Sequence, residues 1–339
     1  MLFLHLLLAI LAITPLTDAR IRRWKCGSTS PIKGFLDGTH YIIAIEKSDA
    51  ASRLHTREEE PYLPRISFPV VFHILDNPYD IILTEMMLAE QFDILKTTFA
   101  AYNIDFYLQS HYYYEQSDWA AGQDYLEMGR QIRVGGYDTL NIYILEIASN
   151  KKGPDEEALG ISSFPEWSEH IDFQADEFWK NGVQLTLNAL VGNPFIDQGP
   201  EDEGKTLVHE VGHWLGLMHT FHHGCHPDFE HGGDMVLDTP PQYKKLGSRW
   251  PNPDTCHPPG TVQQCSADLG FPPNLVDNYM DYIPDACALS FTKGQTVRMN
   301  RWGLIRKELR VIHGIPPGAK EPRFPYQTDA SALKAKAEL

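Results

Sequence analysis

The chain is 339 residues long, 42% hydrophobic and carries a formal net charge of −16. Its apolar content is sufficient for one large folded domain or two smaller ones. The negative charge, which no basic cluster interrupts, argues against nucleic acid and anionic membranes as partners, but it does not identify a substrate.

Residues 1–19 have the features of a signal peptide. An apolar run from Leu2 to Ile13 is followed by Thr17 and Ala19, small residues at the −3 and −1 positions of a cleavage site. A membrane anchor is the alternative, but the run is shorter than the roughly 20 residues that a membrane span needs. The sequence therefore predicts a secreted, extracellular protein. In an oxidising compartment, four of its five cysteines are expected to form two disulfides: Cys225, Cys256, Cys265 and Cys287.

The residues after the signal peptide divide into a leader and a folded domain. Residues 20–64 are polar and charged with little sustained periodicity, and we expect a pro-region there. Hydrophobic patterning predicts strands at 65–75, 104–109, 140–145, 160–165 and 182–187, and helices at 84–102, from about 204, and at 292–310. This order predicts a mixed sheet backed by helices, with the folded domain spanning 65–313 and a flexible tail at 314–339. His73 is interpreted as a hydrogen-bonded strand residue rather than a ligand.

The strongest motif is H-E-x-x-H-x-x-G-x-x-H, which begins at His209. On a helix, His209 and His213 lie one turn apart on the same face. A continuous helix would carry His219 about 15 Å up the axis, so the chain must turn back, and Gly216 can adopt the left-handed backbone that this needs. Three histidines leave the fourth position of a tetrahedral zinc to water, and Glu210 is placed to take that water's proton.

This motif and the later segment Asn278–Tyr282 resemble the metzincin metallopeptidases, and among them the secreted fungal and bacterial members of the pappalysin family. The resemblance covers roughly residues 65–310 and is densest from 204 to 300. Further matching blocks are Gly204–Thr206, His219–Phe221, Gly233–Asp234, Leu237–Pro240, Asp254–Cys256, Asp285–Cys287 and Phe291–Gln295. The resemblance implies an α+β, metzincin-type zincin fold. This fold would have a mixed twisted sheet backed by helices, the active-site helix at the subdomain junction, and a loop-rich, disulfide-stapled C-terminal subdomain.

The resemblance also implies the role of each site residue. Glu210 would be the general base, and Tyr282 would donate a hydrogen bond to the transition-state oxyanion. Met280 would be the Met-turn, an apolar floor under the metal; without the motif, Met280 and Tyr282 would be interpreted as ordinary core residues. The zinc ligands would be His209, His213 and His219.

The cysteine pattern matches the family in one place and departs from it in another. Cys256 and Cys287 match one of the two disulfides that the family usually has. The partner of Cys225 normally precedes the Asp-Thr-Cys block, whereas this chain has Cys265 after it, so the resemblance implies a moved pair, Cys225–Cys265. Four cysteines allow three pairings.

Two further sites follow from the resemblance alone. Cys26-Gly27 resembles the cysteine-glycine of metzincin pro-regions, where a thiolate fills the open zinc position; an ordinary cysteine in a leader is the alternative. Family members also bind calcium after the zinc helix. Asp234, Asp238 and Thr239 offer the hard oxygen ligands that calcium prefers, although each taken singly could be a solvated loop residue.

Together these features predict a secreted, monomeric zinc endopeptidase that acts on proteins or peptides. A non-catalytic secreted zinc-binding protein on the same scaffold is one alternative. A structural zinc protein is another, but such sites need four protein ligands and the motif supplies three. The segment Ile283–Ala286 is expected to line the pocket for the residue after the cut, where Asp285 would favour basic side chains.

Overall fold

The computed structural model describes residues 26–28, 31, 33–56, 63–76, 85–146, 158–167, 176–192, 203–226, 232–243, 256–267 and 270–313. The expected signal peptide, 1–19, and the expected tail, 314–339, lie outside the described residues. Among the helices of the described ranges, none combines the length and the apolar character that crossing a membrane requires.

A five-stranded mixed sheet forms the centre of the molecule, in the order β2-β1-β3-β5-β4. Its strands are β1 (Ile66–Asp76), β2 (Ile104–Glu115), β3 (Leu140–Leu145), β4 (Gly160–Ser162) and β5 (Val183–Thr186). The pairs β1–β2, β1–β3 and β3–β5 are parallel, and β4 runs antiparallel to β5 at the edge of the sheet. The mixed sheet predicted from the sequence is confirmed, although β2 extends past the predicted end at 109.

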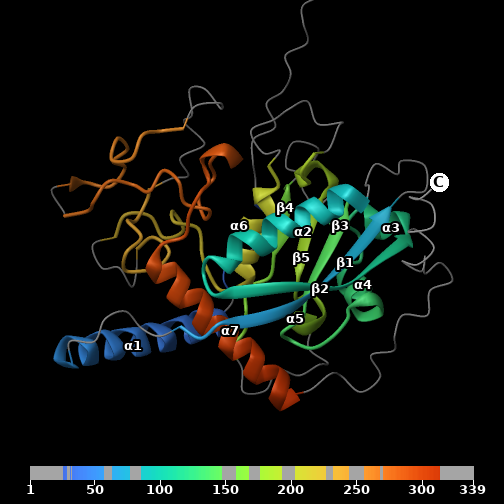
Figure 1. Ribbon diagram of the computed structural model, residues 1–339, viewed down its shortest axis with the longest axis horizontal. Helices are drawn as coiled ribbons and strands as arrows, with labels where there is room; N and C mark the ends of the chain where they lie inside the picture. Colours follow the sequence, from blue (N-terminus) through green and yellow to red (C-terminus); the bar gives the residue numbers. More distant parts are fainter. Residues whose placement is uncertain are drawn as a thin grey trace, which may run out of the picture.

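Helices cover both faces of this sheet (Figure 1). Alternate residues of β1, such as Phe68 and Phe72, pack into the main core with α2 (Glu85–Ala100) and α6 (Lys205–Trp214). On the other face, Leu75 packs with Trp119 of α3 (Ser117–Ala120) and Met128 of α4 (Tyr125–Ile132) in a second cluster. The other short helices are α5 (Asp176–Trp179), η1 (Leu187–Ala189) and η4 (Asp285–Cys287).

His73 lies on this second face and is completely buried. Its Nδ1 atom is 3.0 Å from the Tyr114 hydroxyl, and its Nε2 atom is 2.9 Å from Asn141 Oδ1. Both ring nitrogens therefore have protein partners, which confirms the interpretation of His73 as a structural residue.

Helix α1 (Lys33–Thr56) lies within the expected pro-region, where the sequence did not indicate regular structure. Its inward residues Phe35, Thr39 and Ile42 follow the helical spacing i, i+4, i+7, but two glycines interrupt the pattern and lower the helix propensity. Figure 1 shows α1 crossing α7 (Lys293–His313), the last helix of the chain. Tertiary packing against α7 thus supplies the stability that local propensity does not.

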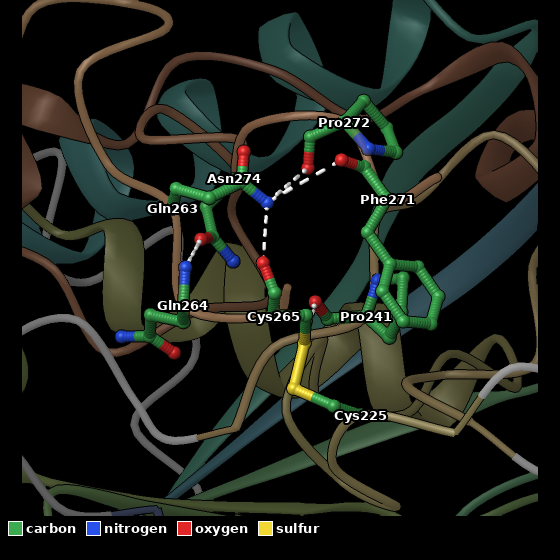
Figure 2. The surroundings of a disulfide bond; sticks show 8 residues. All are labelled: Cys225, Pro241, Gln263, Gln264, Cys265, Phe271, Pro272 and Asn274. Atoms are coloured by element: carbon green, nitrogen blue, oxygen red, sulfur yellow. Dashed lines mark hydrogen bonds between the residues drawn. A yellow bond between two sulfur atoms is a disulfide. The ribbon is translucent and has the colours of Figure 1, made fainter. Parts of the chain in front are cut away.

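The segment between α6 and α7 is rich in loops and lies beside α6 in Figure 1. It is cross-linked by two disulfides, Cys225–Cys265 and Cys256–Cys287, the pairs that the family resemblance implied. Near the first of these, the Gln263 side-chain amide donates to the carbonyl oxygens of Cys265 (2.6 Å) and Pro272 (3.2 Å) (Figure 2). Side-chain amides here satisfy backbone groups that have no strand partner.

Candidate active site

The centre of the site is the end of α6, where the chain reverses after one left-handed residue. Gly216 has φ +85°, and its N–H donates to His213 O at 2.9 Å. The next residue, Leu217, donates its N–H to Gly212 O at 2.9 Å, which completes a Schellman motif. A Cβ at Gly216 would also collide with the ring of Trp302. Glycine is therefore required here both by its backbone conformation and by the closeness of α7.

The turn brings the three motif histidines together with their Nε2 atoms facing one another. His209 Nδ1 lies 2.6 Å from Tyr279 O, and His213 Nδ1 lies 2.7 Å from Leu217 O. A carbonyl oxygen only accepts, so both Nδ1 atoms carry the proton and both Nε2 atoms present a lone pair. His219 Nε2 is 3.1 Å from each of these two Nε2 atoms.

This donor set fits a metal ion. A tetrahedral zinc with Zn–N bonds of about 2.0–2.1 Å separates its ligand atoms by about 3.3 Å, close to the spacing observed, and a cation removes the repulsion between converging lone pairs. The Cys26 sulfur joins the three imidazoles, so that four donor atoms lie within 4.8 Å of one another. Burial lowers the pKa of His209, and lowers that of His213 to about 4, which keeps both rings neutral as ligands must be. No second group of three or more His, Cys, Asp or Glu side chains gathers in this way elsewhere in the described ranges.

Glu210 follows the first histidine and is completely buried beside the edge strand. One carboxylate oxygen, Oε2, accepts a hydrogen bond of 3.0 Å from the Ser28 hydroxyl. The other, Oε1, has no hydrogen-bond partner among the described residues. Position 160 must lack a side chain, because a Cβ on Gly160 would lie 2.6 Å from Glu210 Cγ. Burial raises the pKa of Glu210 to about 8, against the lowering effect of hydrogen bonds from Cys26 and Ser28.

Met280 lies against the zinc-motif helix, and Tyr282 lies against the histidines. Met280 is fully buried beneath α6, and a Cβ on Gly212 would lie 2.5 Å from its sulfur. The ring of Tyr282 is 4.9 Å from the ring of His219. Its hydroxyl accepts the N–H of Cys26 at 3.2 Å and donates to the carbonyl oxygen of Cys26 at 3.1 Å. The structure thus brings together every residue that the sequence assigned to the reaction.

Residues 26–28, hereafter the plug, run along the edge strand through this site. Gly27 donates its N–H to Gly160 O at 2.8 Å, and Ser162 donates its N–H to the Ser28 hydroxyl at 3.0 Å. Burial, and then the Glu210 carboxyl, raise the pKa of the Cys26 thiol, which favours its neutral form. Sequence reasoning missed Ser28, whose only signal is its place next to Cys26-Gly27.

The Asp285 side chain, expected to line the substrate pocket, points toward the start of α6. Its Oδ2 atom accepts the N–H groups of Glu203 (3.1 Å) and Lys205 (2.9 Å) at the start of α6, and the residue is 3% exposed. Burial raises the pKa of Asp285 to about 7. The carboxylate therefore caps the zinc-motif helix, and this placement does not favour the expected role of selecting basic side chains.

Two of the three residues considered for calcium, Asp234 and Asp238, contact the start of α7. The Asp238 carboxylate accepts from the Thr292 hydroxyl (2.7 Å) and from Gly294 N–H (2.8 Å). Asp234 accepts from Val236 N–H (3.1 Å) and from the side-chain amide of Gln295 (3.2 Å). Both carboxylates thus hold the first turn of α7 against the preceding loop. Thr239, the residue after Asp238, is buried.

The sequence of this chain matches a known protein family and several known proteins. A family model described as peptidase M43, pregnancy-associated plasma protein-A, matches residues 137–302. Extracellular metalloprotease 1 of Coccidioides posadasii is 31% identical over 282 residues, which cover 82% of this chain and 88% of the relative. An extracellular metalloprotease of Verticillium alfalfae is 33% identical over 269 residues, which cover 78% of this chain and 85% of the relative.

Solved structures share the fold. Mature mirolysin of Tannerella forsythia, in complex with a cleaved peptide, aligns with a TM-score of 0.50 at 23% identity, covering 74% of this chain and 99% of its own. A promirolysin mutant from the same organism aligns with a TM-score of 0.53 at 22% identity, covering 84% of this chain and 97% of its own. These likenesses show that the chain shares the overall fold of these proteins.

Proposed function

The chain belongs to the pappalysin family of metzincin metallopeptidases, and we propose that it is a secreted zinc endopeptidase whose ligands are His209, His213 and His219. The observation that carries this proposal is the convergence of three Nε2 lone pairs, two of them fixed by Nδ1–H···O=C hydrogen bonds. Export is supported by the extracellular relatives and by the apolar run at residues 2–13. The catalytic domain would span 65–313, after a pro-region at 20–64.

Zinc held by these histidines would lower the pKa of a water molecule and polarise the scissile carbonyl. Glu210, buried beside Gly160, would take a proton from the water and pass it to the leaving amine. The Tyr282 hydroxyl would donate to the developing oxyanion once it is released from Cys26. Met280 would keep the floor of the site apolar. An extended substrate would pair with the open edge of β4, as the plug does.

The plug supports a latent form of the enzyme. Cys26 would supply the fourth ligand of the zinc, while its backbone engages Tyr282 and its neighbour Ser28 engages Glu210. All three groups needed for hydrolysis would therefore be occupied until residues 26–28 leave.

Glu210→Ala tests the catalytic proposal against a non-catalytic zinc-binding protein on the same scaffold. In protein freed of residues 26–56, we expect kcat/KM for a peptide to fall by about 10²–10⁴, the usual contribution of a general base. Zinc content should be unchanged, and the exposed Glu308→Ala on α7 serves as the matched control. Equal turnover by Glu210→Ala and wild type would refute this role for Glu210.

Cys26→Ala tests the latency proposal in the uncut chain. Removing the sulfur should raise peptidase activity, because a water can then reach the fourth position. In cobalt-substituted protein, the sulfur-to-metal charge-transfer absorption should disappear as well. A variant that stays as inactive as wild type, with an unchanged cobalt spectrum, would show that Cys26 is not a ligand.

A further inference from the structure

Helix α1 packs on a continuous surface built from separate parts of the expected catalytic domain. Phe35 is 0% exposed, and its ring centroid is 4.6 Å from that of Phe164 and 5.4 Å from that of Trp302. Ile42 and Ile43 are buried in the same cluster. We call this surface the docking face; it consists of Phe164, Trp167, Met218, Met235, Arg298, Arg301 and Trp302.

The contact is close enough to exclude a side chain from one position of the helix. A Cβ on Gly38 would lie 2.5 Å from the Trp302 ring and 2.6 Å from Trp167 Cβ. The helix backbone therefore rests directly on two indole side chains. This complementarity belongs to the helix itself and does not depend on the peptide that links α1 to β1.

Charges match across the same contact. The guanidinium of Arg298, 1% exposed, makes two hydrogen bonds of 3.0 Å to the Glu46 carboxylate, and Arg301 pairs with Asp49 one turn further along. In a chain with a net charge of −16, two arginines beside an apolar surface fit a helix that carries carboxylates.

The docking face also adjoins the metal-binding histidines. Met218 precedes His219 in the chain, and the ring of Phe164 is 5.1 Å from the ring of His213. Because α1 begins at Lys33, only residues 29–32 separate it from the plug. A bound α1 thus holds the plug within a few residues of the histidines, at a high local concentration.

We infer that the docking face is a helix-binding surface that retains α1 after the chain is cut between residues 57 and 64. A single cut then leaves residues 26–56 bound and the site filled, and activity appears only when α1 itself leaves or is degraded. This inference rests on the latency proposed above, but retention of α1 can be measured without any catalytic activity.

The test uses the full-length secreted chain with Glu210→Ala and an inserted recognition site for a sequence-specific protease between Arg57 and Pro61. After complete cutting, size-exclusion chromatography and mass spectrometry report whether the fragment that ends near residue 57 co-elutes with the rest. We expect co-elution at physiological salt. Release of the fragment as soon as the chain is cut would overturn the inference, whatever the role of Glu210 or Cys26.

Two variants distinguish specific docking of α1 from nonspecific association of the fragment. Gly38→Leu places a side chain against Trp302 and should speed release of the cut fragment by at least about tenfold, the effect of losing roughly 1.4 kcal/mol. Ala44→Leu puts the same side chain on the exposed face of α1 and should leave retention unchanged. Equal retention by both variants would also overturn the inference. In the cut chain with Glu210 intact, peptidase activity should appear with the rate of fragment release, not with the rate of cutting.

Discussion

At the scale of single residues, the buried histidines fall into two kinds that differ in the hydrogen-bond partners of their ring nitrogens. Both nitrogens of His73 have protein partners, the Tyr114 hydroxyl and Asn141 Oδ1, so no lone pair is left for a metal. His209 places Nδ1 against Tyr279 O and directs Nε2 toward the other motif histidines. The hydrogen bond to the second nitrogen thus decides whether a buried imidazole is structural or can be a ligand.

Because burial lowers the pKa of His73 to about 3, this ring stays neutral in the fold while an unfolded chain protonates near pH 6.5. His73 therefore contributes stability that is fully present above pH 6.5 and is lost as the pH falls from 6.5 toward 3. In His73→Phe we expect thermal stability to fall less steeply between pH 6 and pH 4, by up to about 1.4 kcal/mol per pH unit. Thermal unfolding at several pH values checks this, with the exposed His40→Gln as control; identical slopes for wild type and His73→Phe would contradict it.

At the scale of elements, α6 is fixed at both ends by residues distant in sequence. Asp285 caps its first turn, and at the other end Arg306 of α7 donates to Trp214 O at 3.0 Å while its guanidinium lies 3.9 Å above the Trp214 ring. The motif predicted the helix and the turn at Gly216, because both depend on neighbouring residues. It could not predict the Asp285 cap, which joins residues 80 positions apart.

We expect Asp285→Ala to lower the free energy of unfolding by about 1–3 kcal/mol, since two N–H groups at the start of α6 lose their acceptor. Asp285→Asn should recover part of this loss, because an amide oxygen can still accept. Thermal unfolding measures the stability, and a peptide library should show the same preference after the cut for Asp285→Ala as for wild type. A changed cleavage preference with an unchanged free energy of unfolding would indicate that Asp285 contacts the substrate.

At the scale of the whole molecule, the site joins the sheet edge, α6, the loop-rich segment and the plug. Strands with strong hydrophobic patterns, such as Leu140–Leu145, could be predicted from the sequence, as could the fold class. The strand order could not, because pairing such as β3 with β5 depends on contacts with no local signal. Helix α1 could not be predicted either, because it is stabilised by packing on Trp302. Nor could the side-chain amides that hydrogen-bond the loop backbone.

Since the three histidines come from both sides of the Gly216 turn, metal binding should stabilise the fold as a unit. With residues 26–56 removed, we expect a chelator to lower Tm by about 5–15 °C, the effect of losing a ligand held at 100–1,000 times its Kd. Thermal unfolding with and without chelator measures the shift. His219→Ala should unfold at a temperature that the chelator barely alters, and an equal response in this variant would place the stabilising metal elsewhere.

The contact between Ser28 and Glu210 joins residues 182 positions apart. Because Ser28 comes first in the chain, it is synthesised before Glu210, and this matters for the cell that makes the protein. A ribosome adds about 5–20 residues per second, so the plug is made roughly 10–40 seconds before the first histidine of the site. The histidines, Glu210 and Tyr282 therefore fold in the presence of the segment that contacts them. Under the proposed latency and export, the cell that makes this chain would hold it with residues 26–28 in place, and its own newly made proteins would be spared.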